Sequence, residues 1–312
     1  MAEKMATRDA YGQVLVELGG ELPQLVVMDA DLSGSTRTAK FRDAYPDRFF
    51  NMGISEADLF GTAAGLAVSG KIVCASTFAM FATGRAFEII RNSIGYMHAN
   101  VKICATHAGI TVGEDGASHQ TYEDLALMRT IPGMTVINPS DGISAKKLIR
   151  QAVALDGPCY IRLGRSGVPI FYGEEAELQI GRGSLVRPGR DVTLAATGIM
   201  VNEAAMAAET LAADGIDARV IDLHTLKPLD RDLILQAASE TGAIVTAEEH
   251  SVIGGLGEAV AGLTARECPC RLAMVGQQDV FGESGKPEEL KRKYGMTAAD
   301  IVRAARGLLE SR

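Results

Sequence analysis

Apolar β-branched segments alternate with amphipathic segments along almost the whole chain. Short apolar runs bounded by turn residues are typical of buried strands, whereas apolar residues three or four positions apart are typical of helices. Strands that alternate with helices in this way form βαβ units around a parallel sheet. We therefore predict an α/β fold with two domains, each a mostly parallel sheet flanked by helices.

The predicted strands lie at residues 25–28, 49–52, 72–75, 101–106, 135–137, 159–163, 192–195, 218–221, 243–247 and 271–274. The predicted helices lie at residues 8–18, after residue 56, and at 85–94, 122–128, 143–155, 202–213, 231–241, 256–266 and 298–309. Prolines and glycines interrupt the pattern between residues 164 and 191, which favours a linker. The predicted domains are therefore 1–170 and 191–312, with a linker at 171–190.

Length and charge narrow the class of protein. The 312 residues suit about two domains. The net charge is −8 and no basic stripe carries interleaved aromatic residues, which argues against a nucleic-acid partner. No apolar run approaches the ~20 residues that span a bilayer, and the first eight residues lack the apolar core of a signal peptide. We expect a cytoplasmic protein with no membrane contact.

The five cysteines do not form a recognisable metal or redox motif. Cys74, Cys104 and Cys159 fall in apolar strand-like runs, so we expect them to be buried core residues. Cys268 and Cys270 lack the second pair of a zinc site and the spacing of a thioredoxin-type motif. We assign no metal site to this chain.

Polar and aromatic residues gather just after four consecutive predicted strands. In an open parallel sheet, ligands bind beyond the carboxyl ends of the strands. The second predicted domain has no comparably dense clusters. The four clusters are Asp29–Ser35, Ser55–Glu56, Thr77–Phe81, and Thr106–His107 with the loop at residues 113–120.

Glu56 permits two interpretations. An acid in the first turn of a helix is favourable simply because it complements the helix dipole. Alternatively, a carboxylate held among apolar neighbours binds a proton more readily than one in water, which suits proton transfer.

The other candidates are histidines, aromatic residues and arginines. His107 and His119 lie on either side of one glycine-rich acidic loop, which favours a functional pair over two structural histidines. Phe78 and Phe81 either pack in the core or form a platform for a heteroaromatic ring. The guanidinium groups of Arg8, Arg162 and Arg165 are candidates for anion binding. The glycines at 254, 255 and 257 open a helix and are a weak candidate for an anion site.

At these residues the chain resembles the transketolase family, specifically its C-terminal half, a pyrimidine-binding domain followed by a C-terminal domain. The most specific block is Gly113-Glu-Asp-Gly-Ala-Ser-His-Gln120. The other blocks follow in the family's order: Ala30-Asp31-Leu-Ser-Gly-Ser35, Gly53-Ile-Ser-Glu56, Ser76-Thr-Phe78-Ala-Met-Phe81 and Thr106-His107.

The resemblance implies a site for thiamine diphosphate. Glu56 matches the carboxylate that bonds N1′ of the aminopyrimidine and favours the imino tautomer, which removes the thiazolium C2 proton. Phe81 matches the ring that stacks on the pyrimidine, with Phe78 beside it. Asp31 is also expected to bind the cofactor.

The resemblance implies a second group of residues that bind the sugar phosphate. Two of these residues, His107 and His119, are also expected to be catalytic, together with Glu56. The group consists of Arg8, Ser35, His107, Asp115, His119 and Arg165.

One position departs from the family pattern. Ala108 stands where the family commonly has an acid after the histidine, which leaves open whether the sugar is a standard or a modified sugar phosphate. His107 itself argues against a deoxyxylulose-phosphate synthase.

The family also holds the diphosphate and its metal through a Gly-Asp-Gly motif in a separate N-terminal domain, and this chain has no Gly-Asp-Gly. Diphosphate binding needs that neutralising charge. The resemblance therefore implies a partner subunit that carries the diphosphate-binding domain and holds Mg²⁺ or Ca²⁺, in an α2β2 assembly with self-association of this chain. Small residues after Glu56 suit close approach of a partner helix: Gly61, Ala63, Ala64, Gly65 and Ala67.

Together these features predict a subunit of a split transketolase, a transferase that moves a two-carbon ketol unit between ketose and aldose phosphates, as in the pentose phosphate pathway. Two alternatives stay open at this point. One is the β subunit of a 2-oxoacid dehydrogenase E1 enzyme, and the other is a non-catalytic assembly protein with the same fold.

Overall fold

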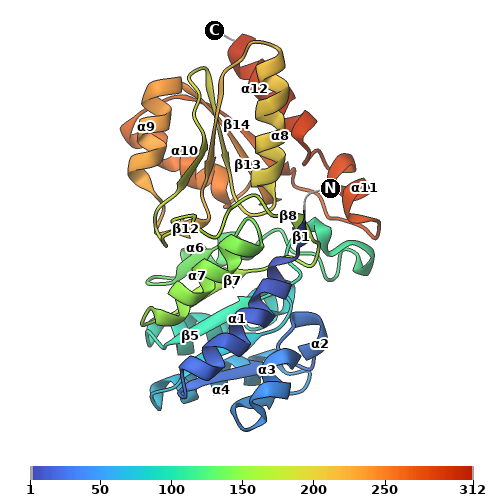
Figure 1. Cartoon of the computed structure of the whole chain (residues 1–312), viewed down its shortest axis with the longest axis vertical. Helices are drawn as coiled ribbons and strands as arrows, with labels where there is room; N and C mark the ends of the chain where they lie inside the picture. The colour runs from blue at the N-terminus through green and yellow to red at the C-terminus, as the bar shows by residue number, and fades with distance from the viewer. Residues whose placement is uncertain (1–2, 311–312) are drawn as a thin grey trace.

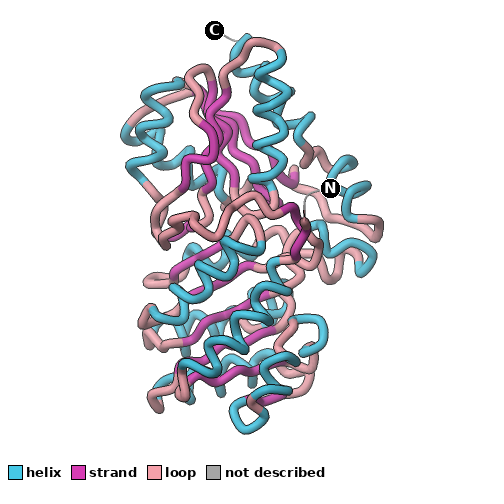
Figure 2. The backbone as a smooth tube through the Cα atoms, in the orientation of Figure 1, coloured by secondary structure: helices cyan, strands magenta, loops and turns pink. Residues whose placement is uncertain are grey.

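The structure is a computed structural model that describes residues 3–310, so residues 1–2 and 311–312, at the outer ends of the two predicted domains, lie outside it. The apolar runs form two large sheets, one at each end of the elongated molecule (Figure 1). Strands of the first sheet run across the long axis, whereas those of the second run along it (Figure 2). The predicted α/β architecture with two mostly parallel sheets is confirmed.

The first sheet has seven strands in the order β12-β6-β7-β5-β4-β2-β3. Every neighbouring pair is parallel except β12 with β6. Its central strands are buried along their whole length, which explains their continuous apolar sequences. The bounds are β2 (Leu25–Asp29), β3 (Phe49–Asn51), β4 (Ile72–Ser76), β5 (Val101–Ala105), β6 (Thr135–Ile137), β7 (Cys159–Arg162) and β12 (Thr225–Lys227).

Helices cover both faces of the first sheet. On the face nearer the viewer in Figure 1 lie α1 (Thr7–Glu21), α3 (Ala39–Ala44) and α7 (Gly142–Ala154). The opposite face is covered by α4 (Glu56–Val68), α5 (Phe87–Ile89), α6 (Asp124–Thr130) and two π-helical segments, η2 (Phe81–Arg85) and η3 (Ile90–Tyr96). The helix predicted at residues 85–94 is therefore not a regular α-helix, because widened π turns occupy most of it.

The second sheet has five strands in the order β14-β13-β10-β11-β9, with α8 and α12 on one side and α9 and α10 on the other (Figure 1). Only β9 is antiparallel to its neighbour. The strands are β9 (Ser184–Arg187), β10 (Val192–Ala196), β11 (Ala218–Asp222), β13 (Ala243–Ser251) and β14 (Arg271–Gln277). The helices are α8 (Met200–Ala213), α9 (Arg231–Thr241), α10 (Leu256–Glu267) and α12 (Ala298–Glu310).

Several small elements were not predicted, and one of them links the two halves of the chain. Strand β12 comes from the second half of the chain yet forms the edge of the first sheet. The strands β1 (Lys4–Met5) and β8 (Val168–Pro169) pair as a separate antiparallel ribbon. Strand β9 lies inside the predicted linker. The remaining short elements are α2 (Ser33–Thr36), η1 (Pro46–Arg48), η4 (Ile110–Asp115) and α11 (Pro287–Lys293).

Two further sequence predictions can be compared with the structure. Cys74, Cys104 and Cys159 are buried, as predicted. Within residues 3–310, no helix is long and apolar enough to cross a membrane.

Candidate functional site

The strand order explains how four separate segments form one site. Strands β5, β4, β2 and β3 are consecutive neighbours and run parallel, so their carboxyl ends share one edge of the first sheet. The segments after these strands carry the candidate residues. The structure thus brings the predicted clusters to the same edge, as expected for a ligand site in a parallel sheet.

Two phenylalanines and two histidines form a ring cluster at this edge. The Phe78 ring stacks on His107 with ring centroids 3.8 Å apart, and on Phe81 at 5.8 Å. His119 meets the edge of Phe81 at 5.3 Å. Such stacked and edge contacts are the favoured geometries of aromatic rings. The segments that follow β4 and β5 thus bring these four side chains together.

His107 is neutral in this arrangement. Arg8 Nη1 lies 3.0 Å from His107 Nε2, and a guanidinium can only donate, so Nε2 accepts. The ring proton is then on Nδ1, which donates to Thr106 Oγ1 at 2.8 Å. Burial, followed by the charges of Arg8 and Arg165, lowers the pKa of His107 to about 3. His107 can therefore offer a fixed hydrogen-bond geometry but not a positive charge near neutral pH.

Arg8 lies half-buried between two of the strand-end segments. It also donates to the backbone oxygen of Ser35 at 3.1 Å, which places α2 beside the ring cluster. Burial, and then the nearby Arg37, lower the pKa of Arg8. Its Nε is buried without a hydrogen-bond partner among residues 3–310. A buried, unpaired guanidinium donor is suited to an anionic ligand.

Asp29 and Asp31 behave differently although they are two residues apart. The carboxylate of Asp29 is buried and accepts hydrogen bonds from the hydroxyls of Thr36 and Thr38. Burial nevertheless raises the pKa of Asp29 to about 6. Asp31 is exposed and accepts from Asn51 Nδ2 at 3.0 Å. This contact joins the ends of β2 and β3 at the turn that leads into α4.

Glu56 is the first residue of α4 and is only 3% exposed. Its Oε2 has no hydrogen-bond partner among the described residues, and the nearest cation, Arg85 Nη1, is 3.9 Å away. The position fits the favourable interaction of an acid with a helix N-terminus. That interaction does not satisfy Oε2, however, and an unpaired buried acceptor costs about 1–3 kcal/mol. The structure thus leaves Glu56 able to accept a hydrogen bond from a ligand.

The remaining candidates are Arg165, which follows β7, and two residues of the loop after β5. That loop begins with the η4 turn, and Asp115 is exposed at the end of that turn. His119 follows, half-buried, with Nδ1 3.0 Å from Ser118 Oγ. Arg165 donates to the backbone oxygen of Val112 and lies 3.2 Å from Glu114 Oε2. Asp115 and Arg165 therefore sit on the outer part of the site, beyond the ring cluster.

Two sequence candidates for anion binding are wrong. Arg162 is buried and donates to Asp124 at 2.7 Å, so it is not available to a ligand. The glycine-rich start of α10 is also unavailable to an anion, because the backbone N–H groups of Leu256 and Gly257 already donate to the carboxylate of Glu248. Burial raises the pKa of Glu248 to about 7.

Three residues of the site were missed by the sequence analysis. Arg85 is the cation nearest Glu56, Asn51 fixes Asp31, and Arg37 adds to the positive field at His107. The position of Asn51 at the end of the short strand β3 was a usable signal. The sequence around Arg85 and Arg37 contains no such signal, because only tertiary packing brings these two residues to the site.

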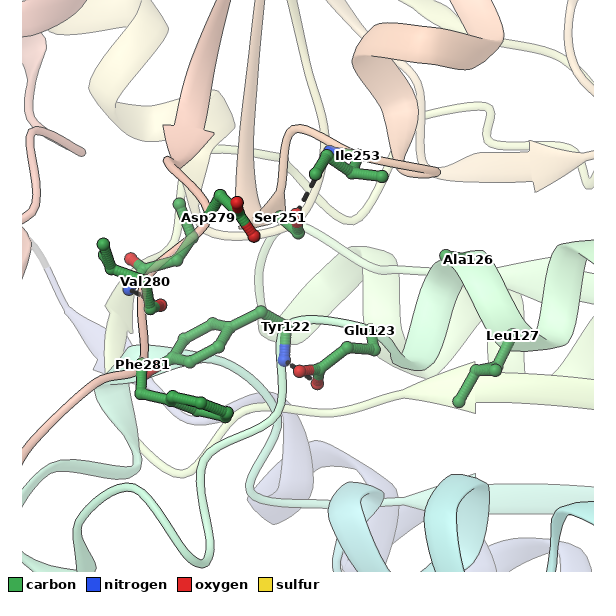
Figure 3. Close-up of a pocket in the computed structure, with 10 residues that line it drawn as sticks. Tyr122, Glu123, Ala126, Leu127, Ser251, Ile253, Asp279, Val280 and Phe281 are labelled. Atoms are coloured by element: carbon green, nitrogen blue, oxygen red, sulfur yellow. Dashed lines mark hydrogen bonds between the residues drawn. The ribbon is translucent and has the colours of Figure 1, made fainter.

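A separate apolar pocket lies at the junction of the two sheets, with a volume of about 350 Å³. Figure 3 shows the rings of Tyr122 and Phe281 on one side of it and Leu127 of α6 on the other. None of the predicted site residues lines this pocket. Within residues 3–310, no group of three or more His, Cys, Asp or Glu side chains is arranged to hold a metal ion.

Two family models together match nearly the whole chain. The model of the transketolase pyrimidine-binding domain matches residues 3–170, and that of the transketolase C-terminal domain matches residues 181–301. The chain is 50% identical over 299 residues to a protein of Methanocaldococcus jannaschii that is provisionally named a transketolase C-terminal section. That match covers 95% of this chain and 94% of the relative.

Two further relatives carry more specific names. A 6-deoxy-6-sulfo-D-fructose transketolase subunit from a Clostridium species is 44% identical, over 97% of this chain and 94% of its own length. A solved structure of a split-gene transketolase, described as an inactive β4 tetramer, superposes with a TM-score of 0.92 at 56% identity. It covers 98% of this chain and 99% of that chain. Curated mammalian relatives are longer, and the match covers only 50% of their length.

Proposed function

The chain belongs to the transketolase family, and on that basis we propose that it is one subunit of a thiamine-diphosphate-dependent transketolase. In this proposal the enzyme transfers a two-carbon ketol unit between ketose and aldose phosphates. The observation that carries the proposal is the buried Glu56 with its unpartnered Oε2, at the same sheet edge as the ring cluster.

The residues present fit the pyrimidine end of thiamine diphosphate. Glu56 offers a buried acceptor to a ring nitrogen, and Phe81 offers the face or edge of a half-buried ring beside Phe78. The bound cofactor supplies the stabilisation of carbanion character that ketol transfer requires. Glu56 has the role of exchanging a proton with the aminopyrimidine. Asp31, held by Asn51, lies next to the turn that delivers Glu56.

The proposed sugar-phosphate side is built from neutral and cationic groups. His107 and His119 hold the hydroxyl groups of the ketose and move protons at its oxygen atoms. Both ring nitrogens of His107 are engaged in this structure, by Arg8 and by Thr106, so a sugar hydroxyl would have to replace one of these contacts, whereas His119 has its Nδ1 beside Ser118 only. The phosphate and the remaining hydroxyls are assigned to the outer residues of the site: Arg8, Ser35, Asp115 and Arg165.

The other half of the cofactor site is assigned to a partner subunit. The chain contains no Gly-Asp-Gly motif, and it spans half the length of the mammalian relatives. A relative that consists of the corresponding chain alone is described as inactive, which supports the need for a partner. We assign the diphosphate and its Mg²⁺ or Ca²⁺ to that partner, in an α2β2 assembly.

The surface of α4 is consistent with a partner contact, with one correction. The sequence analysis placed Ala63 and Ala64 at the partner contact, and this is wrong. Both side chains pack in the core of the chain. Gly61 and Gly65 do face outward, and a Cβ atom at either position would meet nothing within 4 Å. These two glycines leave room for a close approach by another chain.

A modified sugar phosphate is the second candidate substrate. The Clostridium relative is named for a 6-deoxy-6-sulfo-sugar, and Ala108 lacks the acid common in the family.

The proposal keeps the predicted domain limits, 1–170 and 191–312 with the linker 171–190, and a cytoplasmic location.

The test is reconstitution of the enzyme from two purified subunits. The chain would be assayed alone and with an N-terminal transketolase section from the same organism, using xylulose 5-phosphate as donor and ribose 5-phosphate as acceptor. We expect metal-dependent ketol transfer only from the pair. Turnover by the isolated chain would refute the split site, and oxidative decarboxylation of a 2-oxoacid by the pair would favour the E1-type alternative. A pair that assembles but catalyses neither reaction would favour the non-catalytic alternative.

A further inference from the structure

The second sheet supplies a buried carboxylate that reaches the loop of Asp115 and His119. We propose that Glu249 of β13 is a positioning residue, which fixes this loop through Thr111 and so gives the C-terminal domain a part in sugar-phosphate binding. The inference rests on the proposed function, because that proposal assigns the loop to the substrate.

The contact between Glu249 and the loop is short and sheltered from water. Glu249 Oε1 accepts a hydrogen bond from the backbone N–H of Thr111 at 2.7 Å. Glu249 is 3% exposed and Thr111 is 2% exposed. A buried backbone N–H that loses its partner is left without any hydrogen bond, so this contact favours one conformation of the η4 turn.

Gly109 allows the carboxylate to come this close. Its φ of +79° lies in the region that favours glycine. A Cβ atom placed there would lie 2.3 Å from Cδ of Glu249 and 2.5 Å from Oε1. The two residues that flank Ile110 therefore both contact the Glu249 carboxylate: Gly109 lies against it and Thr111 donates a hydrogen bond to it.

Glu249 is itself held by a buried cation from the first sheet. Arg162 of β7 donates from Nη2 to the backbone oxygen of Glu249 at 2.8 Å, and its Nη1 lies 3.9 Å from Oε2. The same guanidinium is fixed by Asp124 at 2.7 Å. Burial raises the pKa of Glu249, while Arg162 and the Thr111 hydrogen bond act in the opposite direction. Arg162 thereby links the Glu249 carboxylate to the sheet that carries the ring cluster.

A second contact with the C-terminal domain holds the other end of the loop. Gln120 Nε2 donates to the backbone oxygen of Glu283 at 3.0 Å, and its Oε1 accepts from Tyr122 Oη at 2.7 Å. Asp115 and His119 lie between Thr111 and Gln120 in the sequence. Both ends of the segment that presents them are therefore fastened to groups of the second half of the chain.

The first experiment measures loop order in the isolated chain. Glu249→Ala removes the acceptor, Glu249→Gln keeps an acceptor oxygen without the charge, and Glu240→Gln makes the same chemical change at an exposed position of the same domain. Hydrogen exchange followed by mass spectrometry would report on residues 109–120. We expect exchange at least about tenfold faster in Glu249→Ala, a smaller effect in Glu249→Gln and none in Glu240→Gln.

Gly109→Ala provides an independent variant that removes no charge. Its Cβ atom would displace the carboxylate from the loop side, so the same segment should lose protection. Unchanged exchange in both Glu249→Ala and Gly109→Ala would overturn the inference. Faster exchange throughout the chain in both variants would also overturn it, because that result means general unfolding rather than a loosened loop.

The second experiment uses the reconstituted enzyme. Because the loop is assigned to the sugar and not to the cofactor, Glu249→Gln should raise KM for the ketose phosphate several-fold while the affinity for thiamine diphosphate stays unchanged. An equal loss of cofactor affinity would contradict a positioning role. If the wild-type pair shows no ketol transfer, the proposed function fails, and the exchange result still decides whether Glu249 orders the loop.

Discussion

Arg8 donates a hydrogen bond from Nη1 to Nε2 of His107 across 3.0 Å. This contact joins the start of α1 to the segment after β5, two parts of the chain that are 99 residues apart. It also determines the chemical state of the imidazole, since a guanidinium beside Nε2 opposes a second ring proton. The lowered pKa of His107, about 3, follows from burial together with this and neighbouring positive charges.

Replacing Arg8 should therefore raise the pKa of His107. In Arg8→Gln the ring loses its nearest positive charge, so its pKa should move from about 3 toward the ordinary value of about 6.5. Nuclear magnetic resonance of the imidazole signals over pH 3–8 would measure this. Arg190→Gln, a change at an exposed arginine, is the control. A wild-type His107 that titrates near 6.5 would contradict the assignment.

The same shift has a consequence for stability. A histidine whose pKa is depressed by folding contributes stability that is fully present above pH 6.5 and is lost as pH falls toward the folded value. Thermal unfolding of Arg8→Gln should accordingly show a weaker loss of Tm between pH 6 and pH 4 than the wild type. An equal loss in both proteins would show that His107 does not contribute to the acid sensitivity.

Glu56→Gln should remove activity without preventing assembly. The amide keeps the shape of the carboxylate but cannot exchange a proton, so we expect kcat of the reconstituted enzyme to fall by about 100-fold or more. Size-exclusion chromatography should show an unchanged complex with the partner. Glu209→Gln, the same chemical change at an exposed position of α8, is the matched control. Near-normal turnover of Glu56→Gln would exclude the assigned role.

Gly61→Leu and Gly65→Leu should separate folding from assembly. Space around both positions is open in this chain, and glycine is a poor helix former, so the variants should be at least as stable as the wild type. A leucine would nevertheless block close approach by a partner helix, so reconstituted activity should be lost. Gly307→Leu on α12 is the control, because its Cβ position is equally open. Undiminished assembly of both α4 variants would place the partner elsewhere.

Asp222→Asn should change how stability depends on pH. Burial raises the pKa of Asp222 from 3.8 to about 7, although Ser140 and Tyr172 donate hydrogen bonds to it. The wild type therefore loses stability as pH rises from about 4 through 7, by at most about 4 kcal/mol. The variant lacks this loss, so its Tm relative to wild type should increase over that range and then level off. A constant difference would contradict the raised pKa.

Much of the fold follows from local pattern. Continuous apolar runs predicted the buried strands, and the strand at Thr135–Ile137 and the helix at Arg231–Thr241 match residue for residue. The edge strand β12 was missed because it is only three residues long and its partner, β6, is 88 residues earlier in the chain. The π turns were missed because their width depends on packing against α4 and α6 rather than on composition.

The candidate site was predictable where strand ends carry unusual residues. Phe78, Phe81, His107 and His119 each follow a strand and do meet. Arg162 was misjudged because sequence alone cannot distinguish an arginine that awaits a ligand from one already neutralised by Asp124. Contacts such as that of Glu249 with Thr111 span 138 residues and have no local signature.

The position of β12 has a consequence for how this chain can be divided. Its three residues come from the second half but pair with β6 at the border of the first sheet. A fragment that ended in the linker would expose the β6 border as an unpaired edge, which favours aggregation. A break in the linker is therefore a poor place for gene fission or domain exchange, because the first sheet takes its edge strand from beyond that break.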